Sequence, residues 1–242
     1  MTPLFACHGI GLDGRFFDRQ RPALAPRQVI SVDMPGFGGQ ALDGPTDFPM
    51  LTERLSDAIG DHAPAPVIGH SMGGMVALEL AATRPDRISA LILCNTTSAF
   101  GGRDDTFKQQ FVSARLAPLD AGKTMADIAP AAMRATCGAD VSEDDVAFLA
   151  GLMAEAPEAA YRAAIDCLVT FDRREALAGL AIPSLLIGGE DDQAAPARTM
   201  QRMAEKIVHA RCHILPGGHM TPVEQTHAVN DLIRDFLEEV ER

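Results

Sequence analysis

The sequence predicts an α/β fold with a mostly parallel, doubly wound sheet. Short apolar runs rich in strand-forming residues recur at intervals too long for hairpins, which is typical of buried parallel strands. Segments with helical spacing of apolar residues separate these runs, and this alternation predicts helices on both faces of one sheet. The 242 residues are 47% hydrophobic and 22% charged, so the chain has enough apolar mass for the core of such a fold.

The strand and helix signals follow one another in a regular order. The runs that we expect to form strands are residues 4–7, 29–32, 66–69, 88–94, 183–187 and 212–215. The segments that we expect to form helices between and after them are residues 16–24, 50–59, 72–82, 198–207 and 223–240.

One interval interrupts this alternation. It lacks a strand signal but contains amphipathic helix patterns rich in Ala, Met and Leu. These patterns cover residues 104–116, 124–136, 142–154 and 157–171, with Pro118, Gly138 and Pro157 between them. We therefore interpret residues 1–97 and 182–242 as the α/β core, and residues 98–181 as a helical cap insertion over one end of the sheet.

The charge balance excludes several classes of partner. With 21 basic and 33 acidic residues the net charge is -12, which repels nucleic acid and anionic lipid surfaces. No apolar run reaches the length of a membrane span, and the first residues lack the basic-then-apolar layout of a signal peptide. The sequence therefore predicts a cytoplasmic protein that acts on a small molecule and binds neither nucleic acid nor membrane.

The cysteines and acidic residues show no spacing that suits a metal or redox site. The five cysteines lie far apart and form no CxxC pair: Cys7, Cys94, Cys137, Cys167 and Cys212. Cys7 and Cys94 fall in expected core strands, where a free thiol packs as a small hydrophobic group. No dinucleotide fingerprint opens the first helix. We therefore expect buried thiols, no metal and no organic cofactor.

The sharpest chemical signal is the segment Gly69-His70-Ser71-Met72-Gly73, which follows an expected strand and opens an expected helix. This is the pattern G-x-S-x-G in the setting that it requires. A sharp turn from strand to helix forces the serine into a crowded backbone conformation, and the two glycines remove side chains that would collide. Ser71 is thereby predicted to project from the carboxyl edge of the sheet as a nucleophile.

A serine hydroxyl needs a histidine base and a carboxylate that orients this base. Gly189-Glu190-Asp191-Asp192 follows the strand at residues 183–187, and Gly217-Gly218-His219 follows the strand at residues 212–215. We expect His219 to be the base. Either Asp191 or Asp192 could supply the carboxylate, and we choose Asp192 because of its spacing to Pro196.

An oxyanion hole is expected beside the serine. The N–H of Met72 lies at the start of the helix, where partial positive charge favours an oxyanion. The segment His8-Gly9-Ile10-Gly11 follows the first strand, and its glycines permit the backbone to turn inward. The expected donors are therefore the N–H groups of Ile10 and Met72. A glycine-rich turn that only links strand to helix, with no catalytic role, would show the same sequence pattern at Ile10.

In these motifs the chain resembles the α/β-hydrolase superfamily. The matching segments run in order through almost the whole chain: His8-Gly9, Asp33-Met34-Pro35-Gly36-Phe37-Gly38, residues 69–74, Gly189 with Asp192, and Gly218-His219. Residues 160–165 and 182–192 are similar to the branch of 3-oxoadipate enol-lactonases and small carboxylesterases. The resemblance implies Ser71 as nucleophile, Asp192 as acid and His219 as base. A serine at the turn excludes the chemistry of relatives that use a carboxylate nucleophile.

The chain departs from the superfamily pattern at its start. Only seven residues precede His8, so the first two strands of the usual fold are missing and we expect a sheet of about six strands. The strand at residues 29–32 should then lie at or near an exposed edge. Such an edge invites coverage by a helix or pairing with another chain, and a homodimer is one possible outcome.

These residues together predict a serine hydrolase that cleaves a small to medium carboxylic ester or lactone through an acyl-enzyme on Ser71. The cap could line the site with Phe107, Phe111, Met125, Met133 and Met153. Three arginines, Arg103, Arg134 and Arg162, could receive a substrate carboxylate or could simply be solvated. Other readings stay open: a C-C bond hydrolase or perhydrolase with the same triad, or a non-catalytic ligand receptor that keeps the fold.

Overall fold

A parallel sheet of six strands forms the centre of the molecule. The computed structural model describes residues 1–101 and 105–242. The sheet has the order β2-β1-β3-β4-β5-β6, and all its neighbouring pairs are parallel, which confirms the predicted fold class. The strand bounds are β1 (Leu4–Cys7), β2 (Val29–Ser31), β3 (Ala65–His70), β4 (Ile88–Cys94), β5 (Ser184–Gly189) and β6 (Ala210–Leu215).

The predicted edge strand lies at one edge of the sheet, and a nearby arginine covers it. β2 pairs only with β1 among the strands. The guanidinium of Arg21 donates hydrogen bonds to the Val29 carbonyl and, at 2.7 Å, to the Ser31 hydroxyl. The short 3-10 helix η1 (Gly14–Phe17) packs beside β2, where a Cβ at Gly14 would lie 2.5 Å from the Ser31 Cβ. Part of this edge is therefore occupied by the chain's own groups.

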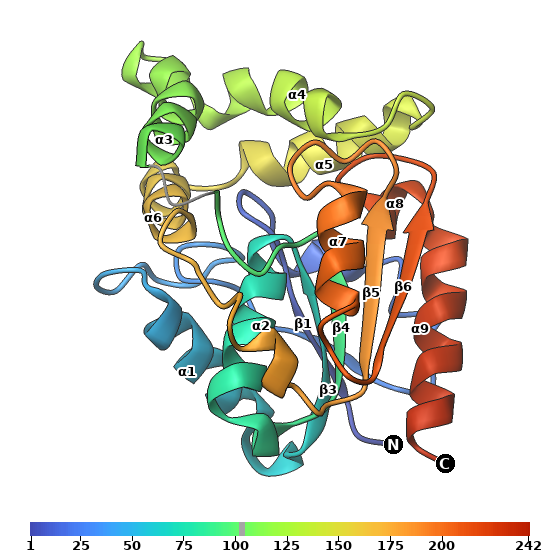
Figure 1. Ribbon diagram of the computed structural model, residues 1–242. Coiled ribbons are helices and arrows are strands. Elements are labelled where there is room, and N and C mark those ends of the chain that lie inside the picture. The colour runs from blue at the N-terminus through green and yellow to red at the C-terminus, as the bar shows by residue number, and fades with distance from the viewer. Residues whose placement is uncertain (102–104) are drawn as a thin grey trace.

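Helices cover the sheet as the alternation predicts (Figure 1). In this view α2 and α7 lie in front of the strands, and α9 packs against β4 and β5. The helices outside the insertion are α1 (Phe48–Ile59), α2 (Met72–Thr83), α7 (Ala197–Ala204), α8 (Thr221–Glu224) and α9 (Thr226–Val240). Short 3-10 segments are η2 (Gly60–His62), η3 (Pro85–Arg87) and η4 (Leu177–Gly179).

Two of the expected helices differ from the sequence prediction. The helix expected at residues 16–24 is limited to η1 followed by turns, because Pro22 and Pro26 lack the N–H that an α-helix needs. The helix expected at residues 223–240 is divided into α8 and α9. Gln225, between them, has φ -124° and ψ 43°, outside the helical region.

Between β4 and β5 the chain forms helices over the carboxyl ends of the strands, at the top of Figure 1. They are α3 (Asp105–Asp120), α4 (Met125–Thr136), α5 (Glu143–Ala154) and α6 (Glu158–Leu168). Thr124 and Ser142 cap α4 and α5 by accepting backbone N–H groups. Pro118 lies inside the last turn of α3 and not between helices, and the expected start at Asp104 falls outside the described residues. The division into core and cap at residues 97–98 and 181–182 stays our interpretation.

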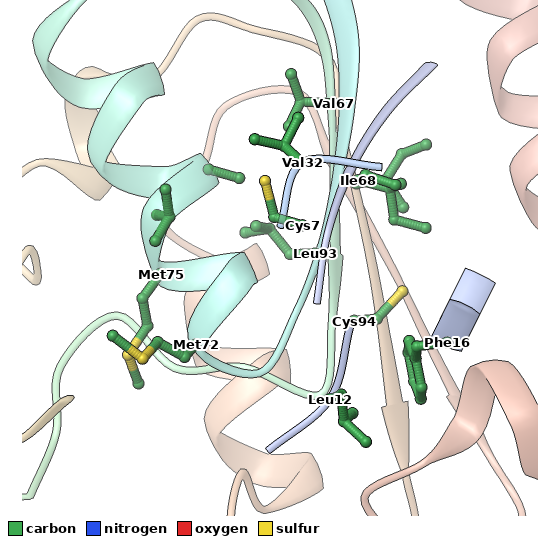
Figure 2. Packing of buried hydrophobic residues seen from close by; sticks show 14 of the residues in the cluster. Cys7, Leu12, Phe16, Val32, Val67, Ile68, Met72, Met75, Leu93 and Cys94 are labelled. Carbon is green, nitrogen blue, oxygen red and sulfur yellow. The ribbon is translucent and has the colours of Figure 1, made fainter. Parts of the chain in front are cut away.

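The core lies on both faces of the sheet (Figure 2). Val67 and Ile68 are neighbours in β3 whose side chains point to opposite faces, and both are buried. Leu93 and Cys94 alternate in the same way in β4. Burial on both faces explains why these strands read as continuous apolar runs.

The thiols follow the prediction in part. Cys7, Cys94 and Cys167 are buried, and burial raises the pKa of the Cys7 and Cys94 thiols to about 12. Cys137 and Cys212 are only half-buried, so the prediction is wrong for these two. Within the described residues, no helix has the length and the hydrophobicity that crossing a bilayer would require.

Candidate active site

Ser71 lies on a sharp turn between β3 and α2, in a strained backbone conformation. Its φ is 53° and its ψ is -119°, a backbone conformation that residues other than glycine rarely adopt. The glycines of the motif have a steric role. A Cβ at Gly69 would lie 2.3 Å from the Gly73 carbonyl oxygen, and a Cβ at Gly73 would lie 2.2 Å from the Cys7 carbonyl oxygen. Larger residues at these positions would push the turn away from the sheet.

Sheet hydrogen bonds fix the start of the site loops. The Ser71 N–H donates to the Cys94 carbonyl at 3.0 Å, and the Asn95 N–H donates to the Ile187 carbonyl at 2.8 Å. Each bond continues the parallel ladder one residue beyond a strand end. The loops after β3, β4 and β5 therefore leave the sheet at the same edge.

The structure brings the side chains of Ser71, His219 and Asp192 together at this edge. The Ser71 Oγ lies 2.9 Å from the His219 Nε2, and the His219 Nδ1 lies 2.8 Å from the Asp192 Oδ2. Because Nδ1–H donates to the carboxylate, Nε2 carries no proton and can accept a hydrogen bond from the serine hydroxyl. Asp192 is 2% exposed and His219 is 8% exposed, so solvent screens their contact weakly.

Asp192, and not Asp191, is the carboxylate at the histidine. The backbone N–H groups of Ala194 and Ala195 each donate to the Asp192 Oδ1 at 2.8 Å. Burial opposes ionisation of this carboxyl, but the hydrogen bonds from His219, Ala195 and Asn95 outweigh it and lower the pKa of Asp192. Asp191 is exposed at the rim of the cavity described below.

Asn95 is a site residue that the sequence analysis missed. Its Nδ2 donates to the Asp192 Oδ2 at 3.0 Å and to the Gly218 carbonyl at 3.1 Å. Its Oδ1 accepts a hydrogen bond from the Thr221 hydroxyl. With φ at 46°, Asn95 turns sharply after β4 and connects the acid loop to the histidine loop. Its place directly after a buried strand was the available signal, the same one that identified Ser71.

The histidine loop is held by α8 and by the helical insertion. The Glu224 carboxylate accepts hydrogen bonds from the N–H of Gly218, at 3.0 Å, and from the N–H of Met220, at 2.9 Å. It also accepts the Gly138 N–H at 2.7 Å, and the His219 N–H donates to the Thr136 carbonyl at 2.7 Å. The end of α4 is thus bonded directly to the loop that carries His219.

A cavity of about 800 Å³ opens above these residues, and Ser71 and His219 form part of its wall. This volume is within the range of small-molecule sites. Of the expected lining residues, four are present: Phe107, Phe111, Met133 and Met153. Met125 does not line the cavity and is buried.

Of the arginines considered from the sequence, Arg134 and Arg162 are not in the cavity wall. Arg134 donates to the Gly138 carbonyl, and Arg162 pairs with Glu158 and Asp120 at 2.8 and 2.7 Å. Arg103 lies outside the described residues. In the described part of the chain, the arginines that line the cavity are Arg115, Arg174 and Arg202, which the sequence analysis did not consider.

Comparison with known proteins agrees with this geometry. The family model described as alpha/beta hydrolase fold matches residues 2–226. The chain belongs to the α/β-hydrolase fold family. This confirms the superfamily that the motifs predicted.

The relatives of this α/β-hydrolase include esterases and a lactonase. It is 29% identical to a pimeloyl-[acyl-carrier protein] methyl ester esterase from Aeromonas hydrophila, over 97% of the chain and 94% of the relative. A thermophilic esterase from Thermogutta terrifontis superposes with a TM-score of 0.89 at 25% identity, covering 100% of this chain and 91% of that one. The enol-lactonase from Burkholderia xenovorans LB400 superposes with a TM-score of 0.85 at 26% identity, covering 98% of this chain and 92% of that one. These similarities agree with the small esterase branch.

The two expected oxyanion donors are backbone N–H groups that make no hydrogen bond within the described residues. Among the described residues the Ile10 N–H has no acceptor, and the Met72 N–H belongs to the first turn of α2, which has no acceptor within the helix. His8 holds the peptide that joins Gly9 to Ile10. Its Nδ1–H donates to the Gly9 carbonyl at 2.8 Å, and its Nε2 accepts the Met34 N–H at 3.1 Å. The role of Ile10 and Met72 stays a prediction.

His70 lies beside Ser71 in the chain, but its side chain is bonded elsewhere. Its Nε2–H donates to the His219 carbonyl at 2.8 Å, and its ring lies 4.4 Å from the Phe16 ring between centroids. Burial, together with the nearby charge of His219, lowers the pKa of His70 to about 3. His70 is therefore neutral in the folded protein at all ordinary pH values.

This buried histidine should make the hydrolase sensitive to mild acid. Between pH 6.5 and about 3 the unfolded chain binds a proton at His70 that the folded chain excludes, so the free energy of unfolding falls as the pH falls. From pH 6.5 to 5 the expected loss is about 2 kcal/mol. Burial lowers the pKa of His8 as well, which adds in the same direction. Urea unfolding at pH 7.5 and 5.0 measures the difference.

The variant His70→Gln is the control for this titration. It keeps a donor for the His219 carbonyl but does not titrate, so its stability should depend less on pH between 6.5 and 5. The lowered pKa of Asp192 affects stability only as the pH falls below about 3.8, outside this window. Equal pH dependence in the variant and the wild type would contradict the assignment to His70.

Proposed function

We propose that this protein is a serine hydrolase that cleaves a small to medium carboxylic ester or lactone. The observation that carries the proposal is the continuous contact of Ser71 Oγ, His219 Nε2, His219 Nδ1 and Asp192 Oδ2, at 2.9 and 2.8 Å, in the wall of a cavity of about 800 Å³. No other arrangement of a nucleophile with an oriented base faces this cavity in the described part of the chain.

The reaction follows from the proton positions. His219 Nε2 takes the hydroxyl proton of Ser71 as the Oγ attacks the carbonyl carbon, and Asp192 stabilises the imidazolium that forms. The N–H groups of Ile10 and Met72 donate to the developing oxyanion. The imidazolium then gives its proton to the leaving alkoxide, which leaves an acyl group on Ser71. Water attacks this ester in the same way, with His219 as base, and the acid is released while Ser71 regains its proton.

The lining of the cavity supports an acyl group with apolar character. Aromatic and sulfur-containing side chains such as Phe111, Met133, Met153 and Tyr161 contribute to its wall. Such residues offer apolar contact without fixing a single ligand shape. The methyl ester esterase and the enol-lactonase among the relatives are named for ester and lactone bonds, which agrees with this substrate class.

Short-chain p-nitrophenyl esters test the proposal. We expect release of p-nitrophenol from the acetate and butyrate esters that requires Ser71. Cleavage of vinylogous diketones with little esterase activity would indicate a C-C bond hydrolase instead, and peracid formation from hydrogen peroxide would indicate a perhydrolase. Thermal stabilisation by esters without any turnover would overturn the enzyme assignment in favour of a ligand receptor.

A further inference from the structure

Positive side chains line the cavity and pair with no carboxylate of the described residues. Arg115 of α3, Arg202 of α7 and Lys206, in the turn directly after α7, belong to its wall. Among the described residues, none of these cations forms a hydrogen bond or ion pair with a carboxylate. Arg115 lies over the Phe111 ring at 5.2 Å, a contact that leaves its N–H groups free. Arg174, also in the wall, is already bound to Asp172 at 3.0 Å.

These three cations lie in the wall of one cavity of an acidic protein. The chain has 33 acidic and 21 basic residues, and several of its arginines are paired, for example Arg173 with Glu79 at 2.6 Å. Arg202 lies in α7 and Lys206 in the turn that follows it, and Thr199 and Met203 also line the cavity. Like charges in one cavity wall repel each other unless an anion lies between them. Folding stability therefore does not explain them.

The position of these cations relates them to the substrate. Arg202 and Lys206 are exposed and Arg115 is half-exposed, so they lie where the cavity meets solvent, whereas the buried His219 lies at its inner end. Asp191 is the acidic residue of the described cavity wall, and it does not balance the charge of the cations. An anion at the outer end would supply the missing partner.

We propose that Arg115, Arg202 and Lys206 form a subsite for an anionic group, a carboxylate or phosphate, at the end of the substrate distant from the ester that Ser71 attacks. The inference rests on the proposed function and narrows its substrate class to esters that carry such a group. Guanidinium and ammonium groups recognise both anions, Arg through paired N–H donors and Lys as a point charge. The net negative charge of the protein makes a local positive site necessary for such a substrate.

Three esters of similar length test the subsite. Methyl hexanoate is neutral, monomethyl adipate carries a terminal carboxylate, and the third carries a terminal phosphate. We expect kcat/KM to be higher for at least one of the anionic esters than for methyl hexanoate, and the advantage to shrink between 20 and 500 mM salt because salt screens exposed charges. The better of the two anionic esters identifies the source of the charge.

Variants show which side chains are responsible. Arg115→Gln, Arg202→Gln and Lys206→Gln should each lower the ratio of kcat/KM for the anionic ester to that for methyl hexanoate by about twofold to fivefold, as expected for exposed charges. The triple variant should lower this ratio by about tenfold or more. Arg198→Gln is the matched control, because Arg198 is exposed on the same helix and does not line the cavity. An unchanged ratio in the triple variant would overturn the inference.

A binding measurement separates failure of the subsite from failure of the proposed function. If methyl hexanoate is cleaved and the ratio does not respond, the hydrolase proposal stands and the subsite is wrong. If no ester is cleaved, calorimetric titration of adipate and of an alkyl phosphate into the Ser71→Ala protein still decides. Binding that the triple variant weakens by about tenfold or more supports the subsite, whereas equal binding or none contradicts it.

Discussion

Replacing Ser71 with alanine is expected to lower kcat for the best ester by about four to six orders of magnitude. The substitution removes the Oγ that lies 2.9 Å from the His219 Nε2, so no acyl-enzyme can form. The oxyanion donors and the cavity wall remain, so KM should change much less than kcat. Steady-state kinetics with a p-nitrophenyl ester measure both values.

The control for Ser71→Ala is a second serine in the same cavity. Ser98 also lines it, but its side chain has no histidine partner among the described residues. Ser98→Ala should change kcat by less than about threefold, as for a substitution outside the reacting groups. Circular dichroism should show that both variants are folded. Activity of a folded Ser71→Ala protein within tenfold of the wild type would contradict the assignment of the nucleophile.

Replacing Asp192 with asparagine should lower kcat by about four orders of magnitude. The carboxylate accepts the Nδ1–H of His219 at 2.8 Å and so keeps Nε2 unprotonated. An asparagine amide can donate to Nδ1 instead, which favours the tautomer with the proton on Nε2. That tautomer cannot accept the proton of Ser71, although the overall geometry is retained.

Asp191→Asn is the matched control for this prediction. Asp191 is adjacent in the chain and lies at the cavity rim, but the carboxylate that contacts His219 belongs to Asp192. The control variant should lose less than about threefold in kcat. Comparable losses in the two variants, or a larger loss at Asp191, would show that the wrong acid has been assigned.

The ends of the strands predicted which three side chains would meet, and Ser71, His219 and Asp192 are in contact. Ser71, Asp192 and His219 each come directly after or shortly after an apolar run, and parallel strands end at one edge of a sheet. Their meeting therefore depends on topology more than on side-chain detail. The spacing to Pro196 favoured Asp192 over Asp191, and the Asp192 carboxylate is the one that contacts His219.

Other features depend on packing that the sequence does not display. Asn95 follows a strand as Ser71 does, but an isolated asparagine has no motif around it, and its contact with Asp192 links residues far apart in the chain. The expected helix at residues 16–24 was favoured by apolar spacing, whereas Pro22 and Pro26 determined the outcome. The cavity arginines could not be selected because helical spacing alone does not say which face of α3 or α7 meets the cavity.

The most direct test of acyl transfer is labelling with a reactive fluorophosphonate, followed by mass spectrometry of the digested protein. The probe phosphonylates a serine only where a base activates its hydroxyl. The account predicts one adduct, on the peptide that contains Ser71, and its loss after Ser71→Ala. An adduct on another residue, or no adduct on the folded wild-type protein, would contradict the central claim that Ser71, His219 and Asp192 form an active nucleophilic site.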